Sequence, residues 1–311
     1  MMVFGPIFSR RFGISLGVDL SPQKKQCNFD CLYCELKPPK RGMPKTIANF
    51  DKVLPLENLL ENVKEALKVH KNIDVLTITA NGEPTLYPHL KEFIIQIKPY
   101  IPKNVKSLIL SNGSLFGDKK LQDTLKEFDI VKFSLDSISS SFKKIDRPHK
   151  SLTIEDIKDG IKSYAKIRKN TLICEILVVE NINDNDNDMI LLADFLREIK
   201  VDRIDLGTID RPPAYNIKAV SFERLLELSK NFESKDSKDL FVSLPQRKNT
   251  NIDILINLSE SDILNTLQKR PIAVNEIENL FNKNSVDRFQ KLFKDGVIKI
   301  KNMGLIDFYT L

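Results

Sequence analysis

The run CNFDCLYC at residues 27–34 places three cysteines, Cys27, Cys31 and Cys34, within eight positions. Three thiolates in one short loop can ligate three irons of an iron–sulfur cube and leave the fourth iron without a protein ligand. A small molecule can bind and react at such an open iron. The spacing therefore predicts an iron–sulfur site with these three cysteines as its metal ligands.

Zinc is the alternative metal for a cysteine cluster, but a structural zinc site takes four ligands. The chain has no second Cys-x2-Cys pair. Its three histidines are His70, His89 and His149, and neither His70 nor His89 has ligand spacing. The fourth cysteine, Cys174, lies in the apolar run TLICEILVV. A free cysteine in such a run behaves as a small hydrophobic residue, so we expect Cys174 in the core.

Composition limits the cellular setting. No apolar run approaches the ~20 residues of a membrane helix, and the N-terminus lacks a signal-peptide pattern. The cysteines cluster instead of spreading as a disulfide framework. We therefore expect a cytoplasmic protein without a membrane segment. Residues 1–50 hold eight Lys or Arg and three Asp or Glu. This excess of basic residues has two interpretations. It forms a solvated surface, or it attracts an anionic substrate such as phosphate or nucleic acid.

Strand-like apolar runs alternate with helix-like segments between residues 55 and 245, after an earlier strand at 12–19. This alternation predicts βα units and a parallel sheet that is curved or closed into a barrel. Chemistry gathers at the carboxyl ends of the strands in such folds, and the cysteine loop follows the first strand. The other expected strands are 73–79, 107–111, 130–135, 171–179, 203–208 and 240–244; the expected helices are 57–70, 88–98, 118–127, 153–168 and 187–199.

Polar residues follow several of the expected strands. The run from Asn81 to Thr85 contains Gly82, Glu83 and Pro84, where glycine allows close backbone approach and proline fixes the turn. Each of the remaining residues also suits a cap or a turn, but together they would line one mouth of the barrel: Ser111, Asn112, Ser134, Asp136 and Glu175.

The C-terminal part has a different pattern. Residues 259–269 and 285–294 have helix patterns, and Ile277, Leu280 and Phe281 suggest a further helix between them. A two-stranded ribbon is expected to turn near 302–304. We predict a barrel domain at 1–248 and a small winged helix-turn-helix-like domain at 249–311. Residues 259–311 carry eight basic and seven acidic side chains, a poor electrostatic footprint for nucleic acid. Substrate or RNA contact and a purely structural role both remain open for it.

CNFDCLYC resembles the Cys-x3-Cys-x-aromatic-Cys signature of the radical S-adenosylmethionine (radical SAM) enzymes, with Tyr33 as the aromatic residue. The resemblance implies one 4Fe-4S cluster whose open iron is chelated by SAM. It also implies reductive cleavage of SAM to a 5′-deoxyadenosyl radical, which abstracts hydrogen from a substrate. An external electron donor such as flavodoxin or ferredoxin would supply the electron.

The same resemblance, over roughly residues 10–210, implies a partial (β/α)6 barrel and a set of SAM-binding residues. Gly82, Glu83 and Pro84 look like the family's element that contacts the SAM amino group. Ser134 and Asp136 look like its ribose-contacting element, and Asn112 resembles a polar residue that faces the same pocket.

The segments GPIFSRRFGISLGVDL and RPPA (211–214) look like the radical SAM group that includes the wyosine-base tRNA synthase. That enzyme uses a second cluster held by additional N-terminal cysteines, whereas no cysteine precedes Cys27 here. We therefore expect one cluster and an unidentified substrate. The alternatives are a tRNA base-modifying enzyme and an iron–sulfur-sensing winged-helix regulator.

Overall fold

The computed structural model describes residues 2–311 except 23–24, 37–52, 234–239, 246–254 and 304–305. Its main sheet has eight strands whose spatial order follows the chain. Strands β2 to β8 pair in parallel, and β1 pairs antiparallel with β2 at the edge. The strands are β1 (Val3–Ser9), β2 (Gly13–Asp19), β3 (Val75–Thr79), β4 (Lys106–Ser111), β5 (Ile130–Ser134), β6 (Thr171–Val178), β7 (Arg203–Thr208) and β8 (Val242–Ser243).

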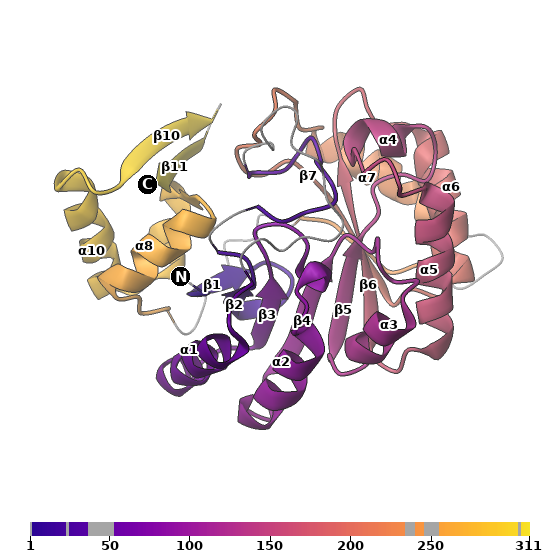
Figure 1. The fold of residues 1–311 in the computed structure, drawn as a ribbon. Coiled ribbons are helices and arrows are strands. Elements are labelled where there is room, and N and C mark those ends of the chain that lie inside the picture. Colours follow the sequence, from indigo (N-terminus) through magenta and orange to yellow (C-terminus); the bar gives the residue numbers. More distant parts are fainter. Residues whose placement is uncertain (1, 23–24, 37–52, 234–239, 246–254, 304–305) are drawn as a thin grey trace.

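Helices connect the parallel strands and cover the outer face of the sheet (Figure 1). Helix α1 is typical, since it buries Leu59, Leu60, Val63 and Leu67 on one side at the spacing of an amphipathic helix. Asp118, Thr153, Asn185 and Ser221 each cap the first turn of the helix that follows. The helices are α1 (Leu56–Val69), α2 (Leu90–Ile97), α3 (Lys119–Leu125), α4 (Ser141–Ile145), α5 (Ile154–Ile167), α6 (Asp186–Glu198) and α7 (Phe222–Ser229).

The two edges of the sheet approach each other, which makes it a partial barrel. Arg11, in the turn between β1 and β2, donates to the carbonyl oxygens of Leu206 in β7 and Ser243 in β8 at 3.1 and 2.8 Å. The six βα units that begin with β2 to β7 confirm the partial (β/α)6 barrel. The sequence patterns did not predict β1, which completes this closure.

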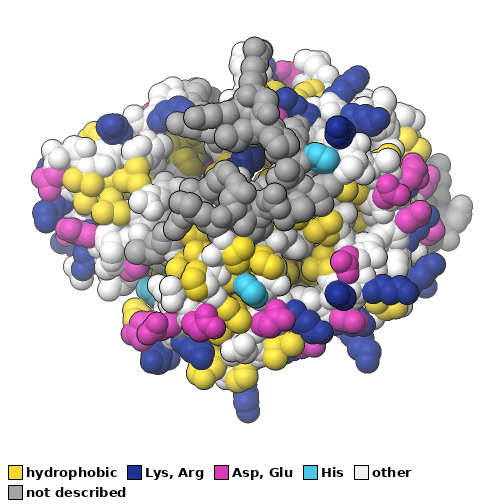
Figure 2. Space-filling view, viewed as in Figure 1, with side chains coloured by type: hydrophobic (Ala, Val, Ile, Leu, Met, Phe, Trp, Pro, Cys, Tyr) yellow, Lys and Arg dark blue, Asp and Glu magenta, His cyan; other side chains and the backbone are white. Residues whose placement is uncertain are grey.

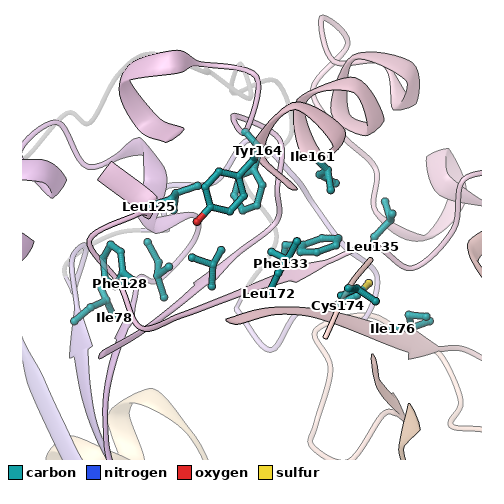
Figure 3. Close-up of a cluster of buried hydrophobic side chains, with 14 of the residues drawn as sticks. Ile78, Leu125, Phe128, Phe133, Leu135, Ile161, Tyr164, Leu172, Cys174 and Ile176 are labelled. Carbon is teal, nitrogen blue, oxygen red and sulfur yellow. The ribbon is translucent and has the colours of Figure 1, made fainter. Parts of the chain in front are cut away.

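The hydrophobic core fills the space between the sheet and its helices. Figure 3 shows Cys174 among core side chains, close to Leu135 and Ile176. The Cys174 side chain is fully buried, as are Phe133 and Ile161 nearby. Its predicted place in the core is confirmed.

The C-terminal unit, residues 255–311, has a separate core centred on Phe281, Phe289 and Tyr309. It packs beside β1 (Figure 1), and Phe8 of β1 and Ile14 of β2 touch that core. Its sheet has the order β10-β11-β9. The elements are α8 (Glu260–Lys269), β9 (Ile272–Ala273), α9 (Ile277–Leu280), α10 (Lys283–Lys294), β10 (Lys299–Met303) and β11 (Ile306–Thr310).

The three expected C-terminal helices and the two-stranded ribbon are present. The division at 248/249 lies in a stretch outside the described residues, so the two-domain boundaries and the winged-helix assignment stay predictions. Basic and acidic side chains are interspersed along the lower edge in Figure 2, the side of α1 and α2 in Figure 1. In the part of the chain that the structure describes, no helix is both long and apolar enough to span a membrane.

Candidate metal centre

The cysteine loop follows β2 and is bonded to the loop that follows β3. Gln26 N donates to Asn81 O, and Glu83 N donates to Gln26 O, both at 2.8 Å. Gly82 lies between these two bonds with φ +138°, and a Cβ atom there would come within 1.8 Å of Gln26 O. Only glycine fits this crossing. The structure thus brings the Gly82–Pro84 run directly against the residue that precedes Cys27.

The opposite side of the cysteine loop is bonded to the end of α4 and to the segment that follows it. Leu32 N donates to Ile145 O at 2.9 Å, and His149 N donates to Asn28 O at 2.8 Å. Phe29 also forms an isolated bridge with Pro148. Backbone hydrogen bonds on both sides therefore fix the path of the loop.

The three thiols are half-buried, and each contacts a different protein group. Phe29 N lies 3.4 Å from Cys27 Sγ, Asp146 Oδ1 lies 3.6 Å from Cys31 Sγ, and Lys25 Nζ lies 3.5 Å from Cys34 Sγ. Burial and the nearby Glu83 carboxylate raise the pKa of Cys27 to about 12. Burial lowers the pKa of Lys25, but the charges of Cys34 and Cys27 outweigh that effect and raise it overall. Lys25 therefore supplies a positive charge beside these thiols.

Three cysteines in one loop fit an iron–sulfur cluster by donor type. No trio of His, Cys, Asp or Glu side chains in the described ranges could hold a single metal ion. A cluster does not need such a trio, because each thiolate binds a different iron. Cys27, Cys31 and Cys34 remain the predicted ligands.

The half-buried Tyr33 pairs with the buried Asp136 beside Cys31. Tyr33 Oη donates to Asp136 Oδ2 at 2.5 Å, and Leu177 N donates to Asp136 Oδ1 at 2.6 Å. Asp136 is fully buried, and burial raises its pKa to about 6 although both hydrogen bonds oppose the shift. Its two oxygens are both bonded within the chain, so this carboxylate orients Tyr33. Its ribose contact stays a prediction.

Glu83 accepts four hydrogen bonds inside the fold. The donors are Thr85 N, Thr85 Oγ1, Ser111 Oγ and Asn112 N, at 2.6–3.1 Å. The Glu83 side chain is 1% exposed, so its carboxylate joins the loops after β3 and β4. Any SAM contact in this run therefore falls to its backbone.

Asn112 reaches the cysteine loop from the end of β4. Its Nδ2 donates to Asn28 Oδ1 at 2.7 Å and lies 4.0 Å from Cys27 Sγ. Ser134 is half-buried at the end of β5, in register with Glu175 of β6. Gly82 and Asn112 are thus brought to the cysteine loop, which itself contains Tyr33. Ser134 lies two residues before Asp136.

A charged network lies on neighbouring strands, and sequence reasoning largely missed it. Lys132 Nζ in β5 lies 2.5 Å from Glu175 and 3.1 Å from Asp205 in β7. Asp205 is fully buried and also pairs with Arg11 and Arg203 at 3.0 and 2.8 Å. The sequence held a signal, because a lysine interrupts the apolar strand IVKFS.

Comparisons with known proteins agree with this architecture. Residues 25–196 match the model of the Radical SAM superfamily. The chain is 45% identical over 310 residues to the UPF0026 protein of Helicobacter pylori strain J99, covering 99% of this chain and 97% of that protein. It is 32% identical over 180 residues to the GTP 3′,8-cyclase of Campylobacter jejuni strain 81116, covering 57% of this chain and 51% of that one.

Among solved structures, the chain resembles Streptococcus suis SuiB bound to its precursor peptide SuiA, with a TM-score of 0.56 and 16% identity. The match covers 74% of this chain and about half, 48%, of that one, and it shows a shared fold. The family match spans the cysteine loop, the Gly82 crossing and strands β3 to β6. The chain therefore belongs to the radical SAM superfamily, in the family of the Helicobacter UPF0026 protein, and is an enzyme.

Proposed function

We propose that this enzyme reductively cleaves SAM and uses the resulting radical to abstract hydrogen from an anionic substrate. The crossing of Gly82 over Gln26 is the observation that carries the proposal. It joins the run that resembles the SAM amino-group element to the cysteine loop through two backbone bonds. Among the described residues, no donor bonds to the Gly82 carbonyl. That oxygen is therefore free to accept a hydrogen bond from the SAM ammonium.

The chain's own residues bind, orient and shield. Cys27, Cys31 and Cys34 would hold a 4Fe-4S cluster, which together with SAM supplies the 5′-deoxyadenosyl radical when bound. Tyr33, held in place by its hydrogen bond to Asp136, lines the proposed site next to Cys34. Asn112 contributes a side-chain amide beside Cys27. The protein contributes position and electrostatics, because the bond cleavage belongs to the cofactor. The electron comes from a reduced partner such as flavodoxin or ferredoxin in the cytoplasm.

Anaerobic reconstitution with iron and sulfide, followed by incubation with SAM and dithionite, tests the proposal. Formation of 5′-deoxyadenosine, measured by liquid chromatography and mass spectrometry, supports it. The Cys31→Ala variant serves as the blank. If a fully loaded cluster yields no 5′-deoxyadenosine above that blank, the proposal is wrong.

A tRNA substrate is the second candidate, and the eight basic residues among positions 1–50 favour it. Binding driven by phosphate contacts weakens steeply as salt rises. Salt-dependent retention of tRNA on the purified protein would support this candidate, and no retention at low salt would exclude it. The regulator alternative instead requires specific DNA binding that changes with cluster occupancy.

A further inference from the structure

Lys25 lies beside one of the three predicted metal ligands. Its Nζ atom donates to Cys34 Sγ at 3.5 Å, and its side chain is only 16% exposed. The sulfur of Cys27 has a different neighbour, since it accepts from the backbone amide of Phe29 at 3.4 Å. Cys34 is therefore a predicted ligand whose sulfur contacts a cation, whereas the contact to Cys27 comes from a neutral group.

Backbone hydrogen bonds fix the chain at both ends of this contact. Gln26, the residue after Lys25, forms two backbone hydrogen bonds with the loop after β3, each 2.8 Å long. Cys34 O accepts from Ala214 N at 2.9 Å, and Cys34 N donates to Cys31 O at 3.1 Å. The backbone thus holds the lysine and the cysteine as neighbours without any contribution from a metal.

The Asp30 carboxylate also lies next to Lys25, but it has a second cation. Asp30 Oδ1 lies 3.7 Å from Lys25 Nζ. Asp30 Oδ2 lies 3.2 Å from Arg147 Nη2 and accepts from the Tyr215 hydroxyl at 2.7 Å. Lys25, Arg147 and Asp30 together carry a net charge of +1. Asp30 is buried, and charges in such a place are screened less than charges at the surface. Loss of the Lys25 ammonium would therefore be felt at Cys34 as the loss of one positive charge.

Reduction of an iron–sulfur cluster adds one electron, so the cluster and its thiolates become more negative by one charge. Hydrogen bonds to the sulfurs and the local charge set the potential at which this happens. We propose that Lys25 is a positioning residue that acts through Cys34 and raises the reduction potential of the cluster. The external donor loses the electron that the cluster gains, and Lys25 keeps its proton throughout. The inference rests on the cluster of the function proposed above, but not on the identity of the substrate.

Potentiometric titration of the full-length reconstituted protein, followed by the electron paramagnetic resonance signal of the reduced cluster, tests this role without SAM. At a fixed potential we expect Lys25→Met to lower the ratio of reduced to oxidised cluster about 10-fold or more. For one electron, a 10-fold change is a shift of about 59 mV to more negative potential. Lys25→Arg keeps the cation and should shift the potential less. Lys68→Met, which removes an exposed cation in the last turn of α1, is the charge-matched control and should titrate as the wild type does.

Iron and sulfide analysis shows whether each variant carries a full cluster. An unchanged potential in a fully loaded Lys25→Met variant would overturn the proposal, and so would an equal shift in Lys68→Met. If Lys25→Met assembles no cluster, Lys25→Gln is the second neutral variant, and loss of the cluster from both would make Lys25 a structural residue and refute its electrostatic role. Because the titration involves no turnover, an unchanged potential would leave SAM cleavage untouched. A failure of SAM cleavage in the loaded protein would leave the shifted potential standing.

Discussion

Lys269 Nζ lies 2.6 Å from Asp19 Oδ2, and the two side chains are only 8% and 1% exposed. The pair joins α8 to the end of β2. Asp19 Oδ1 also accepts from Asn81 N at 2.9 Å, and Asn81 O accepts from Gln26 N. A continuous set of bonds therefore connects the C-terminal unit to the residue before Cys27.

Replacement of Lys269 by methionine should strongly destabilise the protein. The change leaves the buried Asp19 carboxylate without its cation, which costs about 3–5 kcal/mol. Urea unfolding measures the loss. The Lys291→Met control breaks an exposed pair with Glu260 and should cost less than about 1 kcal/mol. Equal losses in the two variants would contradict a structural role for the buried pair.

Replacement of Gly82 by alanine should block cluster assembly. The new Cβ would displace Gln26 and with it the start of the cysteine loop. Iron and sulfide content after reconstitution should fall several-fold. Gly296 also has a positive φ, but a Cβ added there would meet no neighbouring group within 4 Å among the described residues. Gly296→Ala should therefore cost about 1 kcal/mol in strain and keep full iron content.

Loss of a cysteine should depend on its place in the fold. Cys31→Ala should abolish the visible absorption of the reconstituted cluster. Cys174→Ala should retain that absorption, because Cys174 lies in the core away from solvent, and should cost about 1–2 kcal/mol in unfolding free energy. A Cys174→Ala variant that folds but binds no iron would assign Cys174 to the metal centre.

Removal of the Arg11 side chain should open the barrel edge. Arg11→Met leaves the Leu206 and Ser243 carbonyls and one Asp205 oxygen without this donor, at a cost of about 2–3 kcal/mol. Arg10, its neighbour, pairs with Asp210 at the surface, so Arg10→Met should cost less than about 1 kcal/mol. The denaturant midpoints of Arg11→Met and Arg10→Met measure the two losses of stability. A larger loss in Arg10→Met would contradict the closure of the barrel edge by Arg11.

Asp136 should make the apoprotein less stable as pH rises. Its pKa in the folded protein is about 6, above the ordinary value near 4. The stability that the neutral carboxyl gives is therefore fully present below pH 4 and is lost as pH rises through 6. Asp136→Asn stays neutral and should escape this loss, which is on the order of 2–3 kcal/mol. Unfolding curves at pH 4 and pH 7 give the difference. If the difference in unfolding free energy between Asp136→Asn and the wild type is the same at pH 4 and pH 7, the pKa of Asp136 is not raised.

Sequence periodicity predicted the parallel strands well because buried parallel strands are continuous apolar runs. All seven expected strands of the sheet are present within a few residues of their expected bounds. Strand β1 was missed because Gly5 and Pro6 interrupt its short apolar run, and these two residue types usually indicate a turn. The register of its pairing shifts at the same place, between Phe4 and Ile7. The structural role of Glu83 could not be predicted from the sequence. Its hydrogen bonds from Ser111 and Asn112 depend on how the loops after β3 and β4 meet.

Site residues close in the sequence were found more easily than those that meet through the fold. Cys27, Cys31, Cys34 and Tyr33 lie in one short motif. Arg11 and Asp205 are 194 positions apart, and no local pattern indicates that their side chains meet. Only the approach of the two sheet edges brings Arg11 to β7.

The backbone hydrogen bonds on both sides of the cysteine loop bear on how the protein responds to oxygen. Asn81, Glu83, Ile145 and His149 hold the loop without any contribution from metal. Damage to an oxygen-sensitive cluster would therefore leave the ligands in place, with burial raising the pKa of the Cys31 thiol and so slowing its oxidation. Repair of the proposed cluster would then require fresh iron and sulfide at an intact loop, and no refolding of the chain.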